Sequence, residues 1–262
     1  MKAQLYDLTG KAKGEIELPK IFSTPLREDV IAKLVEVERF ESKQPFSLAP
    51  TAGRRHSASG TISHRRHEWK GHYGKGISRV PRKTMWRRGT QFYWIAAEVS
   101  GTRGGRRVHC PTLSHAPKKI NKKEALFALN SAIASTSNSL AIKKRYSSLA
   151  NKELKIKFPI VIESKLENVK SKDFISALKM LLGDLFPLAL KHKEVRAGKG
   201  KQRGRKYKSN AGILLITSNS EKIKLSGIDV IPLNELSVSD LYPAGRITMF
   251  TEKAMHELGG KK

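Results

Sequence analysis

Two spacings of apolar residues alternate along most of this 262-residue chain. Short β-rich runs predict strands at 2–8 and 14–18, around a turn at Gly10, and at 159–162, 212–217 and 228–231. Apolar residues recurring three or four positions apart predict helices at 25–41, 122–138 and 172–186, with a last helix starting at 251–252. Short apolar strands alternating with amphipathic helices are typical of a parallel sheet covered by helices, so we predict an α/β globular body.

Local signals predict where the helices begin. The first should start at Pro25, since proline is favoured at the first helical position, and Glu28 suits the positive end of the helix dipole. Asn121 and Glu124 have the spacing of a capping box, which predicts the start of the second helix. The apolar faces of the three helices are predicted to be Leu26, Val30, Leu34 and Val37; Leu126, Leu129 and Ile133; and Phe174, Leu178, Leu181, Leu182 and Leu185.

Residues 43–119 lack a sustained apolar period over most of their length. They contain 17 basic and two acidic residues, nine of the 20 glycines and all three tryptophans. A structureless segment this long is rare within a compact domain, and it is usually functional or disordered. We therefore divide the chain into a globular body, 1–42 and 120–262, and a long extended basic arm, 43–119. Within the arm, 92–99 can form either a helix or a strand.

The charge is unevenly distributed along the chain. Lys and Arg number 51 against 23 Asp and Glu, giving a formal net charge of +28, which indicates a polyanionic partner. The arm carries +15 of this charge, and a second basic segment, 191–208, carries +8. Because 191–208 leads directly into the predicted strand at 212–217, we expect a basic loop held against the sheet.

The sequence also bears on the compartment. Cys110 is the single cysteine, so no intramolecular disulfide can form, which is consistent with a reducing environment. No apolar run approaches the roughly 18 residues of a membrane-spanning helix, and the residues after Met1 do not resemble a signal peptide. We expect a soluble cytoplasmic protein with no membrane contact.

Basic residues interleaved with aromatic rings favour RNA as the polyanion. Cations bind phosphates, while rings and guanidinium planes stack on unpaired bases. We predict no catalytic residue, metal ligand or cofactor. The candidate RNA-contacting residues are Arg54, Arg55, Arg65, Arg66, Trp69, Lys70, Tyr73, Lys75, Arg79, Arg82, Lys83, Trp86, Arg87, Arg88, Arg103, Arg106 and Arg107 in the arm, and Lys199, Lys201, Arg203, Arg205 and Lys206 in the second basic segment. Trp69, Tyr73 and Trp86 are the predicted stacking rings.

Motifs for other chemistry are absent or weak. No Gly-Lys pair is followed by Ser or Thr, so there is no nucleotide-binding P-loop. A zinc site formed by His64, His67, His72 and Cys110 would lack the usual ligand spacing. Two alternatives stay open: an endoribonuclease that uses His64 and His67, and a nucleic-acid chaperone or DNA-compacting protein, although no helix-turn-helix, basic zipper or zinc-finger signature is found.

A series of short motifs, in this order and spacing, resembles the large ribosomal subunit protein four family in its archaeal and eukaryotic form. The motifs are YDLTG at 6–10, LPKIFSTPLR at 18–27, GKG at 74–76, SRVPR at 78–82, GGRRVHCP at 104–111, HAPK at 115–118, KGKQRGRKYK at 199–208 and GRITMFTE at 245–252. Residues 64–71 and 87–100 are richer in aromatics and histidine than the family pattern, so individual contacts there are not transferred.

The resemblance implies a structural protein of the ribosome without catalytic activity. It implies an α/β domain on the outer face of the large subunit, present as a single copy, and an arm threaded into the large-subunit rRNA. By motif match, 74–88 would be the arm tip that lines the narrow part of the peptide exit tunnel. The implied partners are large-subunit rRNA, neighbouring ribosomal proteins and the nascent peptide.

Overall fold

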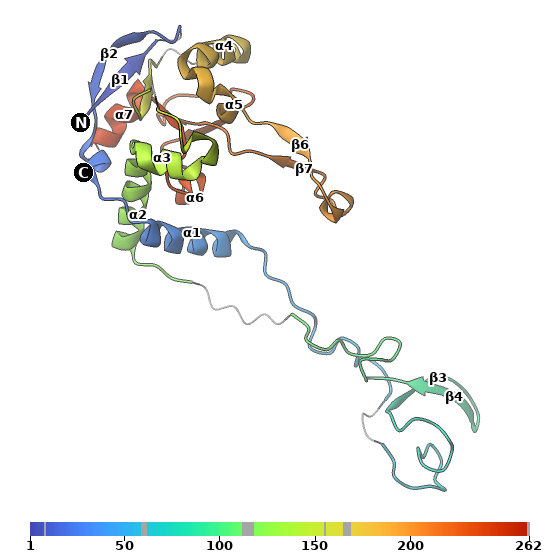
Figure 1. Cartoon of the computed structure of the whole chain (residues 1–262). Coiled ribbons are helices and arrows are strands. Elements are labelled where there is room, and N and C mark those ends of the chain that lie inside the picture. The colour runs from blue at the N-terminus through green and yellow to red at the C-terminus, as the bar shows by residue number, and fades with distance from the viewer. Residues whose placement is uncertain (8, 59–61, 112–117, 155, 165–168, 261–262) are drawn as a thin grey trace. The chain divides into compact units, whose positions relative to one another are not determined.

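The computed structural model describes residues 1–7, 9–58, 62–111, 118–154, 156–164 and 169–260 (Figure 1). The chain divides into two compact units. We call Met1–Ser42 with Lys118–Lys262 the main unit, and Lys43–Pro117 the insertion unit. Leu8 of the first predicted strand and His115 of the HAPK motif lie outside the described residues.

The main unit is built on a six-stranded sheet in the order β2-β1-β5-β10-β8-β9. Its strands are β1 Lys2–Tyr6, β2 Ala12–Glu17, β5 Ile160–Ile162, β8 Leu214–Thr217, β9 Asp229–Pro232 and β10 Thr248–Thr251. Only β1 and β2 are antiparallel, joined through a turn at Gly10; every other neighbouring pair is parallel. The predicted α/β class with a mostly parallel sheet is therefore confirmed.

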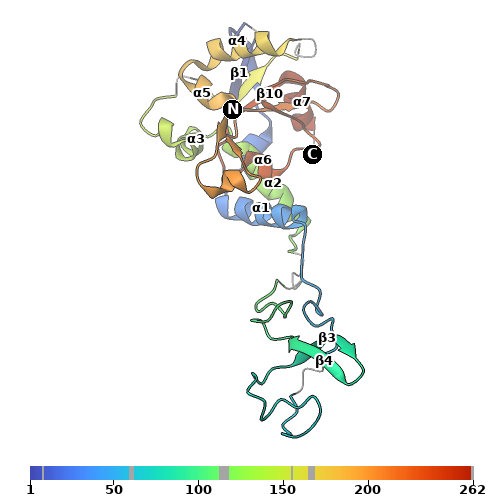
Figure 2. The same cartoon turned by 90° about the vertical axis from the view of Figure 1, so that its right-hand side faces the viewer.

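Helices cover both faces of this sheet (Figures 1 and 2). They are α1 Glu28–Ser42, α2 Lys122–Ser135, α3 Ser139–Arg145, α4 Ser171–Leu182, α5 Phe186–Ala189, α6 Val238–Leu241 and α7 Glu252–Gly260, with short 3-10 turns η1 Lys20–Ser23, η2 Ser147–Leu149, η4 Gly183–Leu185 and η5 Lys199–Gln202. Side chains alternate along β5: Val161 packs in a core with α1, α2, α6 and α7, whereas Ile160 and Ile162 pack in a second core with α3, α4 and α5.

The first helix begins three residues later than predicted, at Glu28 rather than Pro25. Ser131 of α2 explains the difference. Its hydroxyl donates to the carbonyl of Pro25 at 2.9 Å and accepts from the amide of Arg27 at 2.9 Å. These two bonds hold the chain outside the helical path, so the proline precedes the helix.

The second helix has the predicted start but not the predicted cap. Asn121 is its N-cap residue, yet the Asn121 side chain makes no capping hydrogen bond. Glu124 instead accepts from Lys33 of α1 at 2.7 Å, so the capping box is wrong. The helix ends at Ser135 rather than 138, and the hydroxyl of Thr136 bonds back to the carbonyl of Ile133 at 2.7 Å.

Two further differences concern these helices. Leu126, predicted on the apolar face of α2, is 61% exposed, whereas Ile133 is buried as predicted. The helix predicted over 172–186 is broken at Gly183, where φ is +47°, and the chain continues as η4 and α5. Its predicted face is nevertheless buried at Phe174 and Leu178.

Sequence reasoning missed β10, a central strand of the sheet. Its first and last residues, Thr248 and Thr251, are polar yet fully buried, so no continuous apolar run marks the strand. The hydroxyl of Thr251 donates to the buried carboxylate of Glu221 at 2.6 Å. The last helix begins at Glu252, as predicted.

The insertion unit contains a β-hairpin, β3 Arg82–Arg88 and β4 Gln91–Ala96 (Figure 2). Gly89 supplies the positive φ of +57° in the two-residue turn. Of the two conformations left open for 92–99, the strand is the one adopted over most of that range. The extended, RNA-threading form of the arm stays a prediction.

Residues 191–208 are not a simple loop. They contain β6 Lys193–Val195 and most of β7 Tyr207–Ser209, paired as an antiparallel hairpin. The base of the hairpin is anchored by Asn210, whose side chain accepts from the amide of His192 at 2.6 Å and donates to the carbonyl of Leu190 at 2.7 Å. The basic tip around η5 is therefore presented by a paired ribbon.

Candidate nucleic-acid interface

The insertion unit has far more cations than its own carboxylates can neutralise. It contains 15 Lys and Arg residues but only two acidic residues, Glu68 and Glu98. Both carboxylates are already paired, Glu68 with Arg65 and Glu98 with Arg54, the latter at 3.5 Å. At least thirteen cationic charges in this unit thus have no carboxylate of the unit to balance them.

The tip of the β6–β7 hairpin has the same imbalance. Glu194 is the single acidic residue of 191–208, and it pairs with Lys208 at 3.2 Å, away from the tip. The Tyr207 ring lies beneath two cations, with Lys193 Nζ 4.2 Å and Lys206 Nζ 5.5 Å from its centroid. The five predicted contact residues of this hairpin, Lys199, Lys201, Arg203, Arg205 and Lys206, are all exposed.

Most predicted contact residues of the insertion unit are also exposed. They include Arg54, Arg55, Arg65, Arg66, Lys75, Arg79, Arg87, Arg88, Arg103, Arg106 and Arg107. Four are half-buried: Lys70, Tyr73, Arg82 and Lys83. Exposed guanidinium and ammonium groups at this density can bind successive phosphates of a polyanion.

The insertion unit contains an aromatic cluster in which Phe92 and Trp94 are half-buried and Trp69 is exposed. The rings of Trp69 and Phe92 lie 5.4 Å apart at 71°, and those of Phe92 and Trp94 lie 5.4 Å apart at 81°. Lys70 and Arg87 lie over Trp69, at 4.6 and 5.4 Å from its ring centroid. Trp69 thus already contacts a ring and two cations within its own unit, which makes it a poorer stacking ring for a base than predicted.

Tyr73 is held in a second contact group. Its hydroxyl hydrogen-bonds the Nδ1 atom of His64 at 2.9 Å, and Arg79 lies over its ring at 4.4 Å. Nδ1 of His64 is thus bonded to the Tyr73 phenol and not to His67. The two histidines proposed for an endoribonuclease are therefore not paired through this Nδ1 atom.

Among the described histidines of the insertion unit, His72 is the buried one, 7% exposed and with its ring centroid 5.1 Å from that of Trp94. Its Nδ1 atom accepts from the amide of Ser63 at 3.2 Å, which places the proton of the neutral ring on Nε2. Burial lowers the pKa of His72, and the nearby positive charges of Arg82 and Lys75 lower it further. His72 is therefore a neutral packing residue at neutral pH.

The structure reveals one candidate that sequence reasoning missed. Tyr93 is 53% exposed and lies directly opposite Trp86, also 53% exposed, in the β3–β4 ladder. The signal for this pair was present, because Gly89-Thr90 is a two-residue hairpin connection between residues of high β propensity. Without a decision between helix and strand for 92–99, the partner of Trp86 could not be assigned.

Within the described ranges, no three His, Cys, Asp or Glu side chains are close enough to hold a metal ion. In the same ranges, no helix is long and apolar enough to cross a membrane.

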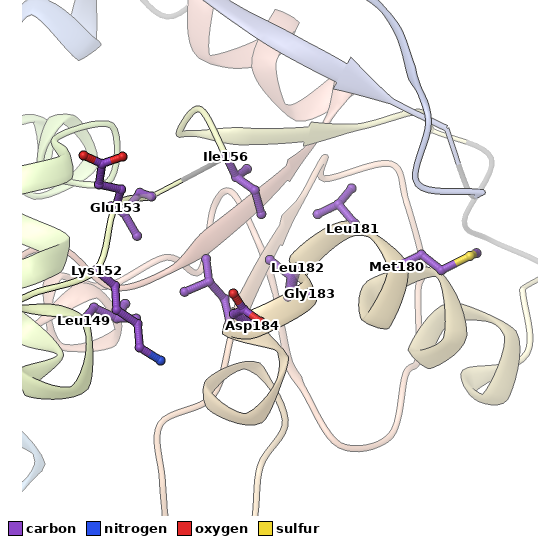
Figure 3. Close-up of a pocket in the computed structure, with 11 residues that line it drawn as sticks. Leu149, Lys152, Glu153, Ile156, Met180, Leu181, Leu182, Gly183 and Asp184 are labelled. Carbon is purple, nitrogen blue, oxygen red and sulfur yellow. The ribbon is translucent and has the colours of Figure 1, made fainter.

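The main unit has a pocket of about 490 Å³ between α4–η4 and the segment after η2, with Leu149, Ile156 and Leu182 among its lining residues (Figure 3). Its charged residues are Lys152, Glu153 and Asp184.

Comparisons with known proteins identify the family of the chain. The family model described as "Ribosomal protein L4/L1 family" matches residues 16–261. Proteins named "Large ribosomal subunit protein uL4" are 36% identical in Thermoplasma acidophilum (98% of this chain, 97% of the relative), 34% in Nanoarchaeum equitans (100% and 99%) and 36% in Methanocaldococcus jannaschii (98% of each). The chain therefore belongs to the ribosomal protein L4/L1 family.

Proposed function

We propose that this protein is a structural constituent of the large ribosomal subunit that binds large-subunit rRNA. The observation that carries the proposal is the charge of the insertion unit, which contains 15 Lys and Arg residues but only two carboxylates. The name shared by the relatives supports it. The family is structural, and the protein is not an enzyme.

The proposed mechanism is neutralisation of phosphates between packed RNA helices. The insertion unit and the tip of the β6–β7 hairpin each supply exposed cations, most of them arginines in the insertion unit. The planar guanidinium group binds a phosphate through two parallel hydrogen bonds and also stacks on bases. The main unit, whose exposed ion pairs include Lys144 with Glu28 at 2.7 Å, supplies a scaffold with its own core.

The partners we propose are rRNA, neighbouring proteins of the large subunit and, at residues 74–88, the nascent peptide in the exit tunnel. We place the protein in cytoplasmic ribosomes as a single copy. The resemblance of 74–76 and 78–82 to the family motifs supports the assignment of the arm tip.

The dependence of RNA affinity on salt tests the proposal. If phosphates are bound, the logarithm of the association constant for an rRNA fragment falls linearly with the logarithm of salt concentration, with a slope of about −0.7 to −0.9 per phosphate. Replacing the five cations Lys199, Lys201, Arg203, Arg205 and Lys206 by alanine should flatten the slope by several such increments. Replacing the exposed Lys172 and Lys179 of α4 is the matched control and should leave it unchanged.

Other results would point to other classes of protein. Affinity that does not change with salt would exclude a phosphate-binding role. Equal affinity for duplex DNA and rRNA would favour a DNA-compacting protein. Cleavage of the RNA that is lost on His64→Gln substitution would favour an endoribonuclease.

A further inference from the structure

The β3–β4 hairpin has two aromatic faces that differ in what they contact. Phe92 and Trp94, two residues apart on β4, lie on one face and pack against each other at 5.4 Å. Tyr93 lies between them in sequence and therefore points to the opposite face. Its cross-strand partner Trp86 shares that face, because directly paired residues project to the same side of a ladder.

A β-bulge creates this second pair. Thr84 is opposite Trp94, but Trp86 is opposite Tyr93, so Met85 is an extra residue on β3. In an uninterrupted ladder, Thr84 and Trp86 would lie on the same face of the strand. The bulge instead turns Trp86 away from the packed cluster, which is how bulges commonly re-aim side chains near functional sites.

Both rings of this pair are open. Each residue is 53% exposed, and within the described part of the chain neither ring contacts another aromatic ring or lies beneath a cation. Trp69, on the other face, is equally exposed at 57%, but it and Trp94 contact both rings and cations, so the difference lies in these contacts. Packing within the protein therefore does not explain why two large aromatic side chains are exposed at paired positions of the hairpin.

The surrounding charge identifies the occupant. Arg88 follows Trp86 by two residues on the same face of β3 and is exposed, and the unit as a whole has 15 cations to two carboxylates. A cationic surface around open rings complements a single nucleic-acid strand, whose bases stack on the rings while its phosphates pair with the cations. An apolar peptide would gain nothing from this charge.

We propose that Trp86 and Tyr93 form a stacking site for an unpaired nucleotide of RNA, with Arg88 as the adjacent phosphate contact. This inference rests on the proposed function, since it requires RNA as the partner. It is more specific, because it assigns base stacking to one residue pair on one face of one hairpin.

The test uses the full chain and two labelled probes: a short single-stranded RNA, and the same strand with its bases removed so that only sugars and phosphates remain. Trp86→Ala should weaken binding of the intact strand about tenfold, leave binding of the abasic strand unchanged, and leave the salt slope unchanged. Trp86→Phe should restore most of the affinity, since it restores a ring. Phe46→Ala, which removes an exposed ring elsewhere in the insertion unit, is the matched control and should have no effect.

Arg88→Ala separates this inference from the proposed function. It should weaken binding of both strands and flatten the salt slope by one phosphate. If the wild-type chain binds neither strand, the proposed function fails and the stacking site fails with it. If both strands bind with equal affinity, or Trp86→Ala weakens both equally, RNA binding stands and the stacking site is wrong. Loss of affinity for an apolar peptide in Trp86→Ala, with RNA affinity unchanged, would also overturn it.

Discussion

Arg246 donates a hydrogen bond from Nη2 to Oδ2 of Asp229 at 2.7 Å, at the start of β9. The Arg246 side chain is only 6% exposed, and the same guanidinium donates to the carbonyls of Ala211 and Asp240 at 2.7 Å each. A single buried cation thus joins the chain entering β8, the end of α6 and the first residue of β9. Arg246 lies within the family motif at 245–252, where it serves the scaffold.

Arg246→Ala should therefore destabilise the main unit strongly. Truncation removes the hydrogen bonds that the guanidinium donates to the carbonyls of Gly212, Asp240 and Ala211, while Lys191 still pairs with Asp229. A buried acceptor left without its donor costs about 1 to 3 kcal/mol. The free energy of unfolding can be measured by urea denaturation followed by far-ultraviolet circular dichroism. Arg27→Ala, which removes an exposed ion pair with Asp29, is the control and should cause no measurable change. Equal effects for the two variants would contradict the account.

Asp229 should give the main unit a stability that is lost in acid. Burial opposes ionisation of this carboxyl, but hydrogen bonds from Lys191 and Arg246 outweigh burial and lower its pKa. A lowered carboxyl pKa stabilises the fold above the unfolded value of about 4, and that stability disappears as the pH falls through the folded pKa. Asp229→Asn should remove this part of the acid dependence, as measured by urea denaturation at a series of acidic pH values.

His72 should make the insertion unit less stable in mild acid. The pKa of His72 is lower in the folded than in the unfolded chain, so protonation favours unfolding. The stability of the unit is therefore fully present above the unfolded pKa of about 6.5 and is lost as the pH falls below that value and through the folded pKa. All three tryptophans lie in the insertion unit, so their fluorescence reports on this unit alone. The urea midpoint from fluorescence should fall between about pH 7.5 and about pH 5.5. His72→Gln should reduce that change, whereas substitution of the exposed His67 should not.

Gly245→Ala should be among the most damaging single substitutions in the main unit. The residue has a φ of +86°, and an added Cβ would overlap the carbonyl group of Ala141 in α3. Strain and overlap together should cost more than about 3 kcal/mol, seen as a large drop in the thermal midpoint. Gly14→Ala is the matched control, since nothing lies within 4 Å of its Cβ position and its φ is not positive. A drop of similar size in both would show that the close contact is not the cause.

The sequence predicted those parts of the fold whose pattern is local. The run at 212–217 identified a central strand because every side chain of β8 is buried and three of its four are aliphatic. The sequence pattern did not predict β10, because the burial of Thr248 and Thr251 depends on strands that are distant in sequence. The start of α1 was displaced for the same reason, through a contact with Ser131 more than one hundred positions away.

The candidate interface shows the same limit. Composition alone identified the basic segments and Trp86 as a candidate ring for base stacking. It could not show that Trp69 packs against Phe92, or that a bulge at Met85 sets Trp86 beside Tyr93, because both depend on the register of the β3–β4 ladder. Residue type predicts the chemistry of such a surface, while register determines which rings are free to use it.

The central claim is that the protein joins the large ribosomal subunit chiefly through its insertion unit. The most direct measurement is co-sedimentation with large subunits of the full chain and of a variant in which residues 43–117 are replaced by a short Gly-Ser linker. The main unit has two hydrophobic cores of its own, so the variant should keep its circular dichroism and cooperative unfolding. The account predicts that the full chain sediments with the subunit at moderate salt and that the folded variant is largely lost from it. Equal retention of both chains, or failure of the full chain to co-sediment, would contradict the account.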